Sequence, residues 1–278
     1  MSLADMYARM KPAIVAVARI EEQSSKPFRI FGSGFCVDSE GIIVTARHVI
    51  TGYYEDVMKA PIPKHRDKFK KPLKEPGFSI VFFRKEKNRY GAVYSKPMSY
   101  IFPLQGEHPE DDVAVLRMPK CPDFWGGAWP SLKLGDIRSI REGDDVATCG
   151  YPLKWEPIES DLPNLTKGIV SRVDEKIGND NKWEVAKLVL SMYVNPGNSG
   201  GPVFDARSGK VIGLISSERV RDPDEIPAQL KGLFQIPTGI VYCIPLGLID
   251  KAISALKSAE TDTSKDKTVP RHITGITP

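Results

Sequence analysis

Short runs of β-branched and aromatic residues, separated by Gly, Pro and Asp, recur along most of the chain. The first set comprises residues 14–20, 32–37, 42–45, 78–83, 90–94 and 113–118. The second set comprises residues 145–149, 167–173, 187–192, 202–204, 210–216 and 239–244. Strands this short and this numerous are typical of a sandwich or a barrel, so the pattern predicts an all-β fold.

Helical periodicity is confined to the two ends of this pattern. In residues 2–10, Ser2 and Asp5 have capping-box spacing, apolar residues recur on one face, and Pro12 follows. Residues 247–258 place Ile249 and Ile253 on one apolar face. We therefore predict a short helix at each end, and a disordered tail over the polar residues 259–278.

Composition limits the class of protein. The 278 residues are 41% hydrophobic and 27% charged, enough for a sizeable core in one large or two small domains. No apolar run approaches the roughly 20 residues that span a bilayer. Asp5 lies where a signal peptide would be basic, and no small-residue cleavage site follows, so we expect a cytoplasmic protein without membrane contact.

The cysteines and the net charge suggest no cofactor. Cys36, Cys121, Cys149 and Cys243 show no CxxC spacing, so neither a zinc site nor a redox pair is expected, and we expect no metal. The net charge of +4 is too slight to indicate a nucleic-acid partner.

One segment is strongly basic. Residues 59–74 hold seven Lys/Arg against one Asp. We favour a solvated surface loop, interrupted by prolines, over a docking site for an acidic partner.

The segment "NPGNSGGP", residues 195–202, places one serine among glycines. It has the composition of a tight turn, because Gly and Asn tolerate positive φ. Such a turn can also aim two N–H groups at one point beside a hydroxyl, as acyl transfer requires. Ser199 is therefore a candidate nucleophile, provided that a base activates it.

One of the four histidines has a suitable setting for that base. His65 lies in the basic loop, His272 in the polar tail, and His108 before a proline in an irregular segment. His48 directly follows an apolar strand, where packing can fix its ring. It is therefore our candidate for the base.

The candidate acid is Asp112, which precedes the wholly apolar run 113–116. A carboxylate that enters a buried strand needs a partner, and the His48 ring would supply one. Asp111 is the alternative, because alternation along this run does not separate the two residues.

Four segments, "GSGF" (32–35), "TARHV" (45–49), "DDVAVL" (111–116) and "NPGNSGGP" (195–202), together resemble the trypsin-like serine proteases, in particular the HtrA/DegP group. The likeness covers most of residues 12–256. It implies two six-stranded β-barrels with the active site in the cleft between them, His48 and Asp112 coming from the first and Ser199 from the second. No PDZ domain is expected after residue 256, as too few residues follow.

The resemblance implies a serine endopeptidase that acts on protein or peptide substrates. His48, Asp112 and Ser199 would form its catalytic triad, and the N–H groups of Gly197 and Ser199 its oxyanion hole. A catalytically silent module that keeps this fold is the alternative. An α/β-hydrolase is excluded, because only His272 follows Ser199 and the alternation of strands and helices is missing.

The resemblance also divides the chain and locates a substrate pocket. We expect an N-terminal helix (1–11), a first barrel (12–120), a connector (121–136), a second barrel (137–246), a helix (247–258) and the tail (259–278). The pocket would be lined by Tyr193, Ile215, Ser216 and Ser217. Since residues 185–198 contain no carboxylate, we expect it to accept a small or medium apolar side chain.

Overall fold

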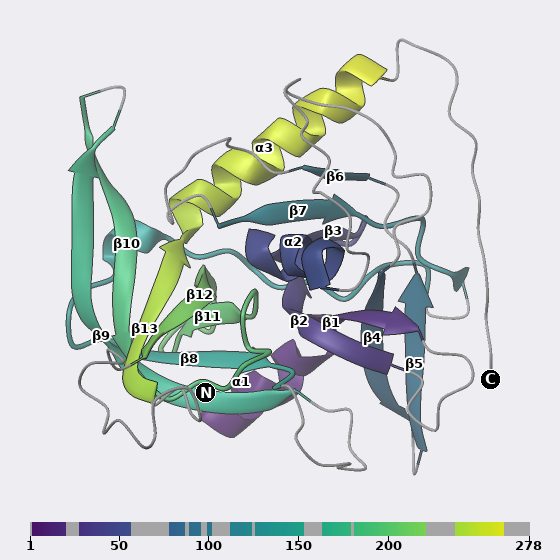
Figure 1. Ribbon diagram of the computed structural model, residues 1–278, viewed down its shortest axis with the longest axis horizontal. Coiled ribbons are helices and arrows are strands. Elements are labelled where there is room, and N and C mark those ends of the chain that lie inside the picture. Colours follow the sequence, from purple (N-terminus) through teal and green to yellow (C-terminus); the bar gives the residue numbers. More distant parts are fainter. Residues whose placement is uncertain are drawn as a thin grey trace.

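The computed structural model describes most of the predicted strands and both terminal helices (Figure 1). The described residues are 2–20, 28–56, 78–86, 89–95, 99–101, 112–123, 126–152, 163–178, 181–220 and 237–263. The basic loop at residues 59–74 and the histidines 65, 108 and 272 lie outside these ranges, as does Asp111.

The N-terminal half forms one antiparallel sheet of seven strands, in the order β5-β4-β1-β2-β3-β7-β6. Its strands are β1 (Ile14–Ile20), β2 (Phe28–Cys36), β3 (Ile42–Thr45), β4 (Ser79–Glu86), β5 (Arg89–Ser95), β6 (Ser99–Ile101) and β7 (Ala114–Arg117). The first predicted six-stranded barrel is not confirmed, because this sheet has seven strands and does not close within the described residues. The short strand β6, which the sequence did not predict, occupies one edge of the sheet.

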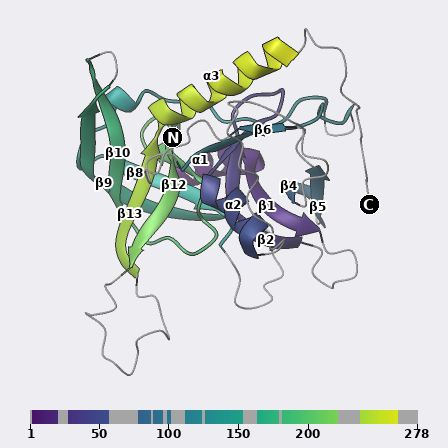
Figure 2. The same ribbon diagram turned by 45° about the horizontal axis from the view of Figure 1, so that its top comes forward.

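The C-terminal half forms a closed barrel of six strands, in the order β10-β13-β12-β11-β8-β9. Its strands are β8 (Asp145–Gly150), β9 (Asn164–Ile177), β10 (Trp183–Ser191), β11 (Pro202–Asp205), β12 (Val211–Val220) and β13 (Pro237–Pro245). The β9–β10 hairpin extends away from β4 and β5 in both views (Figures 1 and 2). Closure pairs every strand of this barrel with two neighbours and leaves it no edge.

The described residues also form three α-helices. The helix α1 (Leu3–Met10) begins with the predicted capping box, in which Ser2 and Asp5 exchange side-chain and main-chain hydrogen bonds. The helix α2 (Arg47–Asp56) was not predicted, because its first residues include the β-branched Val49 and Ile50, which are weak helix formers. The helix α3 (Leu246–Thr263) follows β13 and crosses over β6 and β7 (Figure 1).

The start predicted for the disordered tail, residue 259, is wrong. α3 continues through Thr263, and Glu260 in this extension accepts hydrogen bonds from Arg117 Nε at 2.7 Å and from Arg117 Nη2 at 2.6 Å. Such a bidentate pair is stronger than a single hydrogen bond, and it fixes the end of α3 on β7. Periodicity could not reveal it, because the partner is 143 residues away in the sequence.

The two halves share a continuous apolar core. The larger cluster combines residues of the first sheet with Phe204, Leu214 and Ile244 of the barrel and with the buried face of α3. A second cluster fills the interior of the barrel and includes Leu188 and Ile215. Apolar packing therefore continues from one half to the other.

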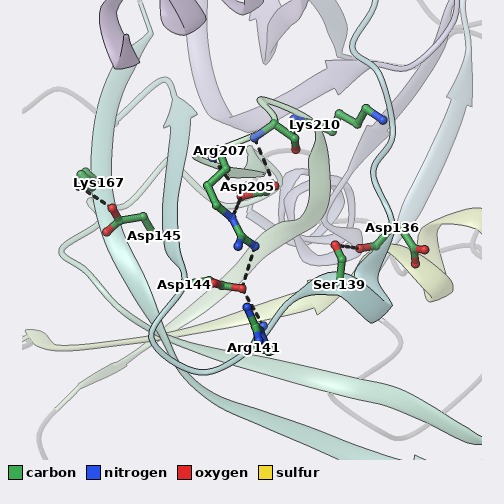
Figure 3. A network of polar contacts seen from close by, with 10 residues as sticks. Asp136, Ser139, Arg141, Asp144, Asp145, Lys167, Asp205, Arg207 and Lys210 are labelled. Atoms are coloured by element: carbon green, nitrogen blue, oxygen red, sulfur yellow. Dashed lines mark hydrogen bonds and ion pairs between the residues drawn. The ribbon is translucent and has the colours of Figure 1, made fainter. Parts of the chain in front are cut away.

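Charged residues hold the start of β8 against the β11–β12 turn (Figure 3). Arg207 Nη2 donates to Asp144 Oδ2 at 3.0 Å, and the main-chain N–H of Arg141 donates to the same oxygen at 2.9 Å. Burial raises the pKa of Asp205, but the hydrogen bonds from Ser208 and Arg207 outweigh burial and hold that pKa below its ordinary value. These hydrogen bonds stabilise the barrel where the segment before β8 meets the β11–β12 turn.

The packing of Phe82 gives a test of the core. Phe82 is fully buried and stacks on Trp129 of the connector, with ring centroids 4.6 Å apart. We expect Phe82→Ala to lower the free energy of unfolding by about 3–5 kcal/mol, because it leaves a cavity. Trp183→Ala is the control, since Trp183 is 69% exposed, and should change that free energy by no more than about 0.5 kcal/mol. Urea unfolding measures both, and equal losses would contradict this packing.

Candidate active site

His48 and Asp112 flank the same end of one strand pair. β3 ends at Thr45, which pairs with Ala114 at the start of β7. His48 follows Thr45 in the first turn of α2, and Asp112 precedes Ala114. Because β3 and β7 are antiparallel neighbours, the residues just after β3 lie next to the residues just before β7.

The carboxylate of Asp112 binds both the ring and the main chain of His48. Its Oδ2 is 2.7 Å from Nδ1 of the ring, and its Oδ1 accepts the His48 main-chain N–H at 2.9 Å. A carboxylate only accepts, so Nδ1 donates to it, and in the tautomer that carries its proton on Nδ1 the other nitrogen, Nε2, is an acceptor. The Asp112 side chain is 14% exposed and that of His48 is 49% exposed, so the ring has a polar anchor and an accessible face.

Ser216 contacts both Asp112 and Ser199. It lies in a bulge of β12, where the register with β13 shifts between Ile215 and Ser217. Its hydroxyl donates to Asp112 Oδ2 at 2.6 Å, and its carbonyl accepts the hydroxyl of Ser199 at 3.2 Å. The sequence placed Ser216 in a pocket wall and did not indicate these contacts.

Ser199 follows a tight turn, as its composition predicts. Asn198 donates its main-chain N–H to the carbonyl of Asn195 at 3.0 Å, with Pro196 and Gly197 between them. The φ of Gly197 is +99°, so the turn has the signature of type II. Within the described residues, the main-chain N–H groups of Gly197 and Ser199 donate to no protein acceptor.

Ser33 of β2 joins this turn to the first sheet. Its N–H donates to the carbonyl of Ser199 at 2.9 Å, and its hydroxyl donates to the carbonyl of Gly197 at 2.7 Å. The same hydroxyl accepts the main-chain N–H of Tyr151 at 2.7 Å. Ser33 is fully buried, so these bonds form away from water, where an unmade bond is costly. The sequence contained Ser33 in "GSGF" without indicating this role.

Gly200 permits the close approach of the turn to the strand end that carries His48. A Cβ at Gly200 would lie 2.2 Å from the carbonyl oxygen of Ser33, 2.3 Å from Thr45 Oγ1 and 2.8 Å from the main-chain N of Ala46. Gly200 also donates its N–H to the carbonyl of Ile215 at 2.7 Å. The backbone beside Ser199 therefore packs directly on the segment that leads to His48.

The residues expected in the substrate pocket have different environments. Tyr193 is 73% exposed, and Ser217 is also exposed. Ile215 is 1% exposed and belongs to the interior of the barrel, so its side chain is a core residue. Tyr193 and Ser217 are thus the two of the four expected pocket residues with accessible side chains.

The described residues contain no group of three or more His, Cys, Asp or Glu side chains arranged to hold a metal. None of the helices described is both long and apolar enough to cross a bilayer. The four cysteines are all buried and free, and burial raises the pKa of the Cys36 thiol to about 12.

A family model matches the region that contains this site. Residues 32–214 match the model of the trypsin-like peptidase domain, and His48, Asp112 and Ser199 all lie within that range. The resemblance to trypsin-like proteases that the sequence motifs suggested is therefore confirmed.

Curated relatives include proteases of the DegP type. A probable periplasmic serine endoprotease DegP-like from Marinomonas sp. is 26% identical over 227 residues, which cover 82% of this chain and 35% of that protein. Protease Do-like 2, chloroplastic, from Arabidopsis thaliana is 36% identical over 103 residues, covering 37% of this chain and 15% of that protein. The chain thus spans about a third of the length of the Marinomonas protein.

These relatives contradict the expected cytoplasmic location, because several of them are named periplasmic serine endoproteases. The expectation depended on the residues near Met1. The unpaired cysteines do not distinguish the two compartments, since a buried thiol without a partner can stay reduced in either.

Solved structures share the fold. Deg5 superimposes with a TM-score of 0.55 at 21% identity, covering 91% of this chain and 92% of that chain. The HtrA-type protease AlgW with a tripeptide superimposes with a TM-score of 0.55 at 22% identity, covering 94% of this chain and 65% of that chain.

Substitution of Gly200 tests the close approach at this site. Gly200→Ala introduces a Cβ against main-chain atoms at φ +82°, so we expect a loss of about 2–5 kcal/mol in the free energy of unfolding. Gly143→Ala is the matched control: its φ is +87°, but its Cβ would meet nothing within 4 Å, so strain alone should cost about 1–2 kcal/mol. Thermal or urea unfolding gives both values, and a Gly200 variant as stable as the control would disprove the approach.

Proposed function

Because the chain belongs to the family of trypsin-like peptidase domains, we propose that it is a serine endopeptidase that cleaves protein or peptide substrates with His48, Asp112 and Ser199. The observation that carries the proposal is the set of bonds around Asp112. Its carboxylate binds His48 Nδ1 at 2.7 Å and the hydroxyl of Ser216, whose carbonyl accepts the hydroxyl of Ser199. One acid is thereby connected to both the base and the strand beside the nucleophile.

In the proposed reaction, the proton on Nδ1 leaves Nε2 of His48 free to accept the Ser199 proton. Ser199 Oγ then attacks the scissile carbonyl carbon, and a tetrahedral intermediate forms. His48 donates its proton to the leaving amine, which gives the acyl-enzyme. Water repeats the sequence, with His48 as the base, and releases the second product. Asp112 holds the ring in the required tautomer and stabilises the imidazolium.

The N–H groups of Gly197 and Ser199 would stabilise the negative charge on the oxygen of the intermediate. Two features support this role: neither group has a protein acceptor within the described residues, and the turn is fixed by the hydroxyl of Ser33 on the Gly197 carbonyl. Losing one such donor typically costs about 10²–10³ in rate.

A catalytically silent module of the same fold is the second candidate, and one contact favours it. The Ser199 hydroxyl donates to the carbonyl of Ser216, so rotation about its Cα–Cβ bond must precede transfer of its proton to His48. Catalytic hydrogen bonds are often formed only when substrate is bound, so this contact is also compatible with an active enzyme.

We also propose that the first sheet forms the N-terminal barrel of a two-barrel protease, beside the closed barrel of β8–β13. Its two edge strands are consecutive in the chain: β5 ends at Ser95 and β6 begins at Ser99. At 3.8 Å between successive Cα atoms, these two ends are at most roughly 15 Å apart, which supports a sheet curled towards closure.

Removal of the Ser199 hydroxyl tests the proposed nucleophile. Ser199→Ala should abolish cleavage of an unstructured protein such as casein, because no oxygen remains to attack the carbonyl. Its unfolding should match that of the native chain, since a turn hydroxyl contributes little to the core. Gel analysis of a casein digest, with Ser208→Ala as a control on an exposed turn, measures the effect. Substantial cleavage by the Ser199 variant would refute the mechanism.

Neutralising the acid tests the tautomer. Asp112→Asn presents an amide to Nδ1 and favours the wrong tautomer of His48, so we expect kcat to fall by roughly 10⁴. Asp111→Asn is the control and should retain activity close to that of the native chain. The comparison needs kcat for one fluorogenic peptide, and a large loss confined to the Asp111 variant would assign the acid to that residue.

A further inference from the structure

Three successive main-chain carbonyls at the proposed nucleophile each accept a hydrogen bond. The carbonyl of Gly197 accepts the hydroxyl of Ser33 at 2.7 Å, and that of Ser199 accepts the N–H of Ser33 at 2.9 Å. The carbonyl between them, on Asn198, accepts the N–H of Gly201 at 2.9 Å. Ser33 therefore anchors the first and the third of three consecutive peptide groups.

The N–H groups of the same stretch are of two kinds. Those of Asn198 and Gly200 donate to main-chain carbonyls at 3.0 and 2.7 Å, whereas those of Gly197 and Ser199 donate to no protein acceptor within the described residues. A peptide group is planar, so holding its carbonyl also sets the direction of its N–H. The peptide group that carries the Ser199 N–H lies between the two groups that Ser33 anchors, so its direction depends on Ser33.

The surroundings of the Ser33 hydroxyl direct its proton at Gly197. Its oxygen accepts the main-chain N–H of Tyr151 at 2.7 Å, and a hydroxyl has one proton to donate. The end of β8 packs directly on this oxygen, because a Cβ on Gly150 would lie only 2.7 Å from it. Ser33 is fully buried, so bulk water does not compete for the Gly197 carbonyl.

An unpaired polar atom in the turn makes this anchor more important. Asn198 is 2% exposed, and its Oδ1 accepts no hydrogen bond in the part of the chain that the structure describes. A buried acceptor without a donor destabilises the conformation that buries it. Without the Ser33 hydroxyl, the turn would keep this cost and lose one of the bonds that offset it.

We propose that Ser33 is a positioning residue for the reaction: its hydroxyl holds the Gly197 carbonyl so that the N–H groups of Gly197 and Ser199 point at the developing oxyanion. This inference rests on the proposed peptidase function. Because Ser33 is buried, it acts through the peptide group between Gly197 and Asn198. Fixed donors stabilise the tetrahedral intermediate more than the bound substrate, so Ser33 affects kcat and leaves KM almost unchanged.

Steady-state kinetics of Ser33→Ala test this role. We expect kcat for a fluorogenic peptide to fall at least about tenfold and KM to change by less than about twofold. Ser79→Ala is the matched control, because Ser79 is 3% exposed and lies on β4, which β1 separates from β2; it should keep both constants. A folded Ser33→Ala variant with the native kcat, or with a loss in KM alone, would overturn the proposal.

A second substitution covers the case in which Ser33→Ala does not fold. Ser33→Cys keeps a side chain of similar shape but offers a weaker donor. We expect its kcat to lie between that of the native chain and that of Ser33→Ala, again with little change in KM. A native kcat in the folded Ser33→Cys variant would overturn the proposal.

Amide hydrogen exchange tests the anchor without any cleavage. The N–H of Asn198 belongs to the same peptide group as the Gly197 carbonyl and donates to a main-chain carbonyl at 3.0 Å. With Ser199→Ala present throughout, we expect Ser33→Ala to accelerate exchange of the Asn198 amide at least about tenfold and to leave Leu190, in the barrel interior, unchanged.

The two measurements separate this proposal from the proposed activity. Faster exchange at Asn198 alone, in a chain whose native form cleaves no peptide, would support the anchor and refute the peptidase function. Unchanged exchange at Asn198, or equal acceleration at Leu190, would overturn the role of Ser33 even where the native chain cleaves peptides.

Discussion

The site depends on the hydrogen bonds by which a buried serine of the first sheet holds the turn of the closed barrel. Ser33 donates its N–H to the carbonyl of Ser199 and its hydroxyl to the carbonyl of Gly197. His48 directly follows β3 and Asp112 directly precedes β7, two strands of the sheet that contains Ser33, whereas Ser199 directly follows the turn. Because Ser33 is fully buried, separating the two halves here would leave several polar groups unpaired away from water.

Asp112, the charged residue of the site, also connects the two halves. Asp112 accepts from the ring and the main chain of His48 and from the hydroxyl of Ser216. These donors come from α2 and from β12, so one carboxylate joins the first sheet to the barrel a second time. This carboxylate thereby holds the ring of His48 and the segment of β12 at Ser216, which contacts Ser199, in fixed relative positions.

The sequence predicted what periodicity and local chemistry determine. The alternation of short apolar runs indicated the β architecture, and the capping residues Ser2 and Asp5 indicated α1. Closure of a sheet, by contrast, depends on pairing between strands far apart in the chain. Pairing between distant strands also determines the bulge at Ser216 and the hydrogen bonds that Ser33 donates. No local sequence pattern encodes either feature.

We propose that Ser199 becomes a nucleophile because His48 and Asp112 act on it. Labelling with a fluorophosphonate, followed by digestion and tandem mass spectrometry, tests this most directly, since the reagent needs an activated serine and no substrate preference. The account predicts one adduct, on Ser199, that disappears when His48 is replaced by alanine. A folded native chain that takes up no label, or takes it up on another serine, would contradict the account.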